Sequence, residues 1–225
     1  VSQALGIAVG DTLEWSSAWK RFQPVLELLE ETPGIAEARV QPICCWEGKI
    51  SLFVGVREEG AGSFAYRPVP DSAIALPQEI SQAYRGYEAA TGEAILKGDS
   101  GVDHSQGHML SANPEARAFE ERFVVFAEKH QEELRQVLRH ATDAEQRQIA
   151  TWVIAYADDK RAIVDDLLYA TRDPDTTVRN NAMRALALIV EYAQDRPDFG
   201  QISPAPLIDM LNSTIWTDRN KATML

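Results

Sequence analysis

The stretch DPDTTVRNNAMRAL, residues 173–186, decides the fold of the C-terminal half. Asp173 and Pro174 are residue types that open helices, as N-cap and first-turn proline. Apolar residues then recur every three or four positions, which is typical of one buried helix face. The positions expected to face inward are Val178, Ala182, Ala185, Ile189 and Tyr192. We therefore predict a helix whose small residues let neighbouring helices approach closely.

Part of this pattern returns elsewhere. An arginine followed three residues later by alanine occurs at Arg147, Arg179 and Arg219. In the first two cases an aspartate, Asp143 or Asp175, lies four residues before the arginine, and this spacing favours an ion pair along a helix. The arginines are 32 (179 − 147) and 40 (219 − 179) positions apart. The register predicts helix pairs that stack into one continuous core.

Helix-opening residues agree with this register. Thr142 and Glu145 form a capping-box pattern, and Ser203-Pro204 repeats the pairing of a cap residue with a first-turn proline. A further helix is expected to begin near Trp216. Ile163, Leu167 and Ala170 indicate the intervening helix.

Two further helices are expected upstream. One begins at Pro77 and ends at Lys97-Gly98, and the next begins at Asn113-Pro114. From there a single stripe runs to about His140, with His130 expected as a core histidine; its members are Phe119, Phe123, Phe126, His130, Leu134, Val137 and Leu138.

The stretch 173–186 resembles the HEAT-repeat signature, in which Asp-Pro-Asp is followed by Val-Arg and an Ala-Leu helix. The 32-residue spacing is shorter than the roughly 40–47 residues of standard HEAT units and is similar to short HEAT-like repeats of bacterial scaffolds and bilin lyases. The resemblance implies an acid–arginine ladder between repeats, with structural roles for Asp143, Arg147, Asp175 and Arg179. An irregular helical bundle is the alternative.

The first 58 residues combine helix and strand patterns. Trp15, Trp19, Phe22, Leu26 and Leu29 recur at helical spacing, and Pro24 predicts a kink or break in that helix. Residues 36–40 and 50–56 are expected to be strands, joined into a hairpin by a turn at 46–49.

This order of elements, from Leu5-Gly6-Ile7-Ala8-Val9-Gly10-Asp11 to Val54-Gly55-Val56-Arg57-Glu58, resembles a POTRA-type domain, whose first strand would be expected before Val1. POTRA-type domains are β-α-α-β-β modules of extracytoplasmic proteins that bind polypeptides, often through a sheet edge. An unrelated small α+β unit is the alternative. We predict an α+β fold class with three parts: 1–58, the POTRA-like unit; 59–112, a linker with one helix; and 113–225, an all-α HEAT-like solenoid.

The composition narrows the classes of function. The net charge of −12, without a Lys/Arg cluster, argues against nucleic acid and anionic membrane surfaces as partners. No apolar run is long enough for membrane insertion. Cys44 and Cys45 are adjacent, so they are poorly placed to pair with each other, and two thiols do not complete a structural zinc site.

Few residues suggest chemistry. Asp103, His104 and His108 form the most reactive cluster and define an alternative metal site, although Gly107 and the polar loop argue against the helix that such spacing needs. The charges of 158–161 and 165–166 are expected to be solvated. Otherwise we predict no catalytic residue, metal or cofactor.

The candidate partner-binding residues lie near the second helix of each pair, where solenoids form concave faces. They are Asn180, Asn181, Arg184, Trp216, Asp218, Arg219 and Asn220. We predict a non-enzymatic scaffold for a protein or peptide, an extracytoplasmic location and the capacity for homo-oligomers. The alternative is a bilin-lyase-like or metal-dependent protein on the same scaffold.

Overall fold

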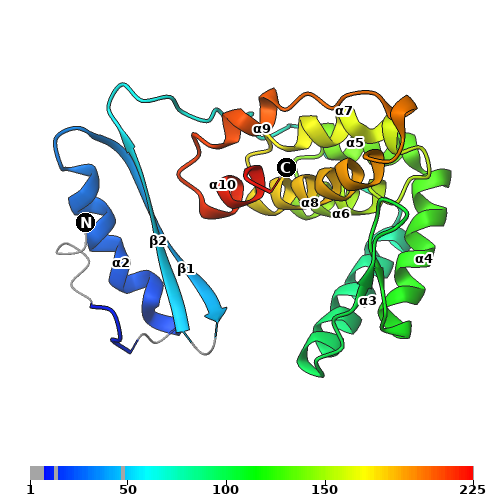
Figure 1. The fold of residues 1–225 in the computed structure, drawn as a ribbon, viewed down its shortest axis with the longest axis horizontal. Coiled ribbons are helices and arrows are strands. Elements are labelled where there is room, and N and C mark those ends of the chain that lie inside the picture. The colour runs from blue at the N-terminus through cyan, green and yellow to red at the C-terminus, as the bar shows by residue number, and fades with distance from the viewer. Residues whose placement is uncertain (1–7, 13–14, 47–48, 225) are drawn as a thin grey trace. The chain divides into compact units, whose positions relative to one another are not determined.

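The computed structural model describes residues 8–12, 15–46 and 49–224 (Figure 1). Contacts divide the chain into two compact units, one of residues up to Phe64 with Ile208–Thr223, the other of Ala65–Leu207 with the last two residues. The predicted α+β class is confirmed, because a helix and hairpin precede a long series of helices. The domain boundaries after residues 58 and 112 stay predictions. Among the described residues, no helix has the length and apolar character needed to cross a bilayer.

Helix α2 (Trp15–Glu30) packs on an antiparallel hairpin of strands β1 (Ile35–Trp46) and β2 (Lys49–Glu58). Both strands are longer than predicted. Of the kink or break expected at Pro24, the break is wrong, because α2 continues through this residue as one helix, and the kink stays a prediction.

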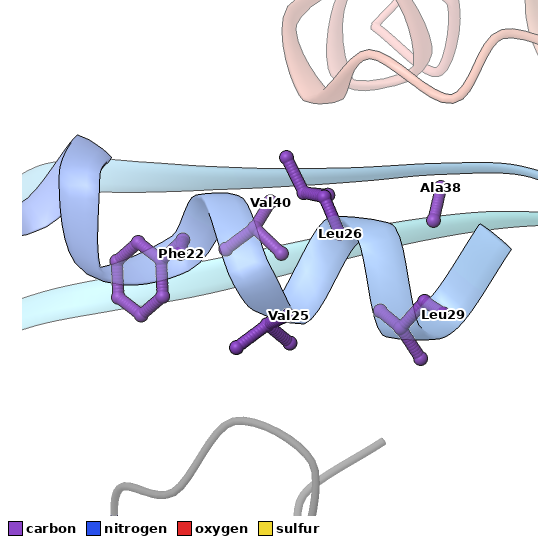
Figure 2. Close-up of a cluster of buried hydrophobic side chains, with 6 residues drawn as sticks. All are labelled: Phe22, Val25, Leu26, Leu29, Ala38 and Val40. Atoms are coloured by element: carbon purple, nitrogen blue, oxygen red, sulfur yellow. The ribbon is translucent and has the colours of Figure 1, made fainter. Parts of the chain in front are cut away.

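The helix and the hairpin share an apolar core. Figure 2 shows the four buried side chains of α2 with two from β1: Phe22, Val25, Leu26, Leu29, Ala38 and Val40. Leu52 and Val54 of β2 pack against this cluster. The predicted burial is therefore confirmed for Phe22, Leu26 and Leu29, while the side chains of Trp15 and Trp19 lie outside the described part of the chain. The predicted turn at Glu47-Gly48 lies outside the described residues, as do the side chains of Cys44 and Cys45.

Helix α10 (Trp216–Ala222) begins where the sequence predicts and belongs to the same unit as the hairpin. The loop before it contacts β1, because the Thr214 hydroxyl donates to Glu37 Oε1 at 2.8 Å and the Trp216 backbone N–H donates to Gln41 Oε1 at 2.6 Å. The short helix α9 (Ala205–Met210) precedes this loop.

The second unit contains α3 (Gln78–Leu96), α4 (Pro114–Lys129), α5 (Gln131–His140), α6 (Ala144–Ile154), α7 (Lys160–Ala170), α8 (Thr176–Ala193) and the 3-10 turn Pro197–Phe199. Asn113 caps α4 with Pro114 following, as predicted. The 99–112 loop contains a two-residue ladder of β3 (Val102–Asp103) and β4 (Leu110–Ser111).

The single helix expected to run to His140 is wrong. His130 has the non-helical angles φ −119° and ψ 24°, so it ends α4 and opens α5. Its ring Nδ1 contacts the Glu133 carboxylate, and its side chain is 11 % exposed.

The helices of this unit stack as pairs. Helix α5 packs on α6 and α7 packs on α8, while α5 contacts α7 and α6 contacts α8 (Figure 1). Two layers result, with α5 and α7 in one and α6 and α8 in the other. Helices α3 and α4 form a further pair whose members both contact α6.

Candidate functional site

The two arginines of the repeat register are almost completely buried. The Arg147 guanidinium donates from Nε to Asp173 Oδ2 at 2.8 Å and from Nη2 to Asp173 Oδ1 at 3.0 Å. Its Nη1 donates to the carbonyls of Ala141 and Thr142 at 2.8 and 2.9 Å. A buried ion pair is stable only when its remaining hydrogen-bonding groups are satisfied, and here they are.

Arg179 repeats these contacts one unit along the chain. Its Nη1 donates to the carbonyls of Asp173 and Pro174 at 2.8 and 3.1 Å, each 32 positions after the residues that Arg147 contacts. The guanidinium also stacks on the Tyr66 ring, 4.4 Å from its centroid. Because the two arginines make equivalent contacts with carbonyls 32 positions apart, the register seen in the sequence is also a repeat of the structure.

The aspartates act differently from the prediction. Asp143 and Asp175 are the N-caps of α6 and α8, each accepting two backbone N–H groups, and the carboxylate that pairs with Arg147 is Asp173 instead of the expected Asp143. The caps predicted at Thr142 and Asp173 are therefore wrong. Asp173 faces Arg147 instead, because a buried guanidinium needs a carboxylate more than a helix end needs a second cap.

The Gly- and Pro-rich segment predicted as a linker is docked along these repeats from Ala65 onward. The Arg67 N–H donates to the Arg172 carbonyl at 2.8 Å, and Ser72 bonds with His140 and Thr142 at 3.1 and 2.8 Å. The segment thus crosses the loops that precede both α6 and α8.

Residues 132–224 match the family model for HEAT repeats. The predicted resemblance of this region is thereby supported, and the match covers the pairs α5–α6 and α7–α8 as well as α9 and α10. Searches of curated proteins and of solved structures found no match.

The layer of α6 and α8 in the HEAT-like region carries a small pocket. Its cavity volume of about 20 Å³ corresponds to space for one or two water molecules. The lining residues come from the β3–β4 loop and both helices: Gly107, His108, Met109, Trp152, Ala155, Tyr156, Asn181, Arg184, Ala185 and Leu188. Most of these side chains are apolar, and the Arg184 guanidinium lies 5.3 Å from the Trp152 ring centroid.

One lining residue of this pocket, His108, contacts a buried lysine. Lys160 opens α7, is 3 % exposed, and its ammonium donates to His108 Nδ1 at 2.8 Å and to the carbonyls of Ala155 and Ala157 at 3.1 and 2.6 Å. Burial lowers the pKa of Lys160 to about 8. Burial and the Lys160 charge lower the pKa of His108 to about 4. At neutral pH the pair therefore consists of an ammonium and a neutral imidazole.

A buried carboxyl group lies behind the pocket wall. Glu120 of α4 is fully buried and accepts from the Ser111 backbone N–H and from the Tyr156 hydroxyl, the latter at 3.4 Å. Burial raises the pKa of Glu120, and burial also raises the pKa of Tyr156 well above its ordinary value. The environment favours the protonated form of both groups.

The alternative metal cluster does not assemble. His108 contacts Lys160, the His104 Nδ1 lies 3.3 Å from Glu191, and Asp103 accepts from the Ser105 backbone N–H. In the described part of the chain, no three His, Cys, Asp or Glu side chains are grouped to hold a metal ion.

The candidate partner-binding residues fall into two places. Asn181 and Arg184 line the pocket, and Asn180 is half-buried beside them on α8. Trp216, Asp218, Arg219 and Asn220 lie on α10 in the other unit. Asp218 is 2 % exposed and accepts from the Ser213 hydroxyl at 2.7 Å, and the Arg219 guanidinium lies 6.0 Å from the Phe53 ring centroid.

Two charges expected to be solvated are buried. Lys160, 3 % exposed, donates to His108, and Asp166, 4 % exposed, accepts from Arg135 and Arg139 of α5 at 2.6 and 2.7 Å. Sequence reasoning also missed Glu120. The signal was the helical spacing, since Ala116, Glu120 and Phe123 share one stripe.

Proposed function

We propose that this protein is a non-catalytic scaffold that binds a polypeptide partner across the α6 and α8 layer of its HEAT repeats. The observation that supports this most directly is the combination of Trp152, Arg184 and Leu188 around one recess on that layer. Tryptophan and arginine are enriched among the residues that contribute most to protein–protein binding. Stacked helical repeats present extended surfaces of this kind to their partners.

The role of the repeat charges agrees with this proposal. Arg147 and Asp173 are buried against each other and against backbone groups, so they stabilise the stack. Arg184 is half-exposed, and within the described residues no carboxylate lies at ion-pair distance from it. Its charge is therefore available to a partner.

The hairpin supplies a second surface to the same proposal. Strands β1 and β2 form a two-stranded sheet, and no described strand pairs with either outer edge. An extended segment of a partner can add to such an edge through backbone hydrogen bonds. The POTRA-type character of this unit, an extracytoplasmic location and homo-oligomer formation remain proposals of the same kind.

Site-specific photo-crosslinking tests the proposed surface. A benzophenone amino acid at Leu188, on the pocket face of α8, is compared with the same amino acid at Asp165, exposed on α7. We expect a discrete crosslinked polypeptide from Leu188 in extracts of the source organism, and its loss when Arg184→Glu is added. Equal crosslinking from both positions, or none from Leu188, contradicts the proposal.

A further inference from the structure

His108 has a buried hydrogen-bonding atom without a partner. The side chain is 5 % exposed and lines the pocket, and no described atom forms a hydrogen bond with its Nε2. Leaving such a group unsatisfied costs about 1–3 kcal/mol, so its persistence needs an explanation. One explanation is a ligand group that completes the hydrogen bond.

The contact with Lys160 determines what His108 offers. An ammonium group has three donors and no acceptor, so Nδ1 must accept the 2.8 Å hydrogen bond from Lys160. The single proton of the neutral imidazole therefore resides on Nε2. The unpartnered atom is a donor, and the group that satisfies it must be an acceptor.

The charges at the pocket favour an anionic acceptor. The three hydrogen-bond partners of Lys160 are His108 and two backbone carbonyls, and no described carboxylate lies at ion-pair distance from its ammonium. Arg184, on the same lining, is likewise without such a carboxylate among the described residues. Asp103 and Asp158 act on His108 only through space, and Glu120 is hydrogen-bonded elsewhere. One cation, Arg184, thus lines the pocket without an ion pair, while the Lys160 ammonium lies behind His108, where Asp158 favours its charged form through space.

We propose that this pocket binds the side-chain carboxylate of an aspartate or glutamate in the polypeptide partner, with His108 Nε2–H and Arg184 as its donors. This inference rests on the proposed function. The cavity of about 20 Å³ has room for one or two water molecules, so a carboxylate requires less enlargement of it than the bulkier phosphate. Because Nε2 is buried, a lining side chain must move to admit the carboxylate, and Met109 is the most adaptable of these.

Nitrogen-15 NMR of the His108 ring in the full chain tests the inference. The probes are acetate and N-acetylglutamate N-methylamide, each paired with its neutral analogue, acetamide or the glutamine derivative. We expect the acids alone to shift the Nε2 signal saturably. Arg184→Gln should weaken binding about tenfold, because a charge-assisted hydrogen bond is lost. The matched control, Arg161→Gln, removes an equal charge from an exposed position of α7 and should leave binding unchanged.

Several results would overturn the inference. The first is an equal shift of the Nε2 signal by acids and amides. The second is no saturable shift up to about 50 mM, a concentration at which a site of millimolar affinity is nearly filled. The third is that Arg184→Gln and Arg161→Gln weaken acid binding equally. Tighter binding of inorganic phosphate would exclude a carboxylate site, and tighter binding of N-acetylglycine would favour a chain terminus over a side chain. Crosslinking from Leu188 detects a bound polypeptide whether or not a carboxylate enters the pocket, so a crosslink without the His108 shift means failure of the carboxylate site alone.

Discussion

Arg147→Met is expected to destabilise the second unit strongly. The substitution keeps an unbranched side chain of similar length but removes two donors to Asp173 and two to the carbonyls of Ala141 and Thr142. It leaves the Asp173 carboxylate, 3 % exposed, without its cation. Removing one partner of a buried ion pair costs about 3–5 kcal/mol, because the other charge stays buried. The melting temperature should fall by roughly 10 °C for a unit of this size.

The matched control is Arg85→Met. Arg85 also donates two hydrogen bonds to one carboxylate, at 3.1 and 2.9 Å from Glu145 Oε1, but the two side chains are 58 % and 50 % exposed. An exposed pair contributes about 0–1 kcal/mol, so the control should change stability little. Urea unfolding followed by far-ultraviolet circular dichroism measures both variants.

A double-mutant cycle sharpens the test. The Asp175 backbone N–H donates to Asp173 Oδ1 at 2.8 Å, and Asp173→Asn keeps an oxygen that can accept this bond. The substitution removes only the negative charge that pairs with Arg147. Combined with Arg147→Met it should cost clearly less than the sum of the single changes, since neither charge is then left alone. The reasoning from the buried Arg147–Asp173 pair would be refuted if the losses of unfolding free energy were additive. It would also be refuted if Arg147→Met and Arg85→Met lowered that free energy equally.

Three further outcomes are expected. Asp175→Ala should cost about 1 kcal/mol in urea unfolding and more than Asp143→Ala, because Asp175 also accepts from a glutamine of α6 at 3.0 Å. The pKa of His108 falls from 6.5 to about 4 on folding, so its contribution to stability is full above pH 6.5 and is lost as pH falls toward 4; His108→Gln should reduce that acid-induced loss. Gly55→Ala should speed hydrogen exchange in α10, because its Cβ would lie 2.1 Å from the Thr214 carbonyl oxygen, and unchanged exchange would contradict that contact.

Much of the repeat region could be predicted from the sequence because its signals are local. Asn113 caps its helix as expected, and the register of Arg147 and Arg179 recurs as equivalent contacts. The partner of Arg147 could not be predicted in this way, because Asp173 lies 26 residues away and is itself a plausible cap. Whether Asp173 caps a helix or pairs with Arg147 depends on how the helices pack, and the local sequence does not contain that information.

The pocket was harder to predict for the same reason. His108 was singled out for a metal, but its actual neighbour, Lys160, is 52 residues distant. Lys160 nevertheless lies on the same helix face as Ile163 and Leu167, so the helical spacing predicts that it is buried. A charged residue within an apolar stripe is better interpreted as buried than as solvated.

Periodicity separates the two kinds of buried charge in this protein. Arg147 has an equivalent in Arg179 32 positions later, and the contacts of both serve the stacking of helices. Lys160 has none, since the residues 32 positions before and after it are Glu128 and Tyr192. A buried charge that recurs in every repeat is stabilised by contacts that every repeat supplies. A buried charge that occurs once must be stabilised by contacts particular to its own position. Lys160 is surrounded by His108, whose Nε2 has no hydrogen-bond partner among the described atoms. We therefore place ligand recognition at His108 and not at the recurring arginines.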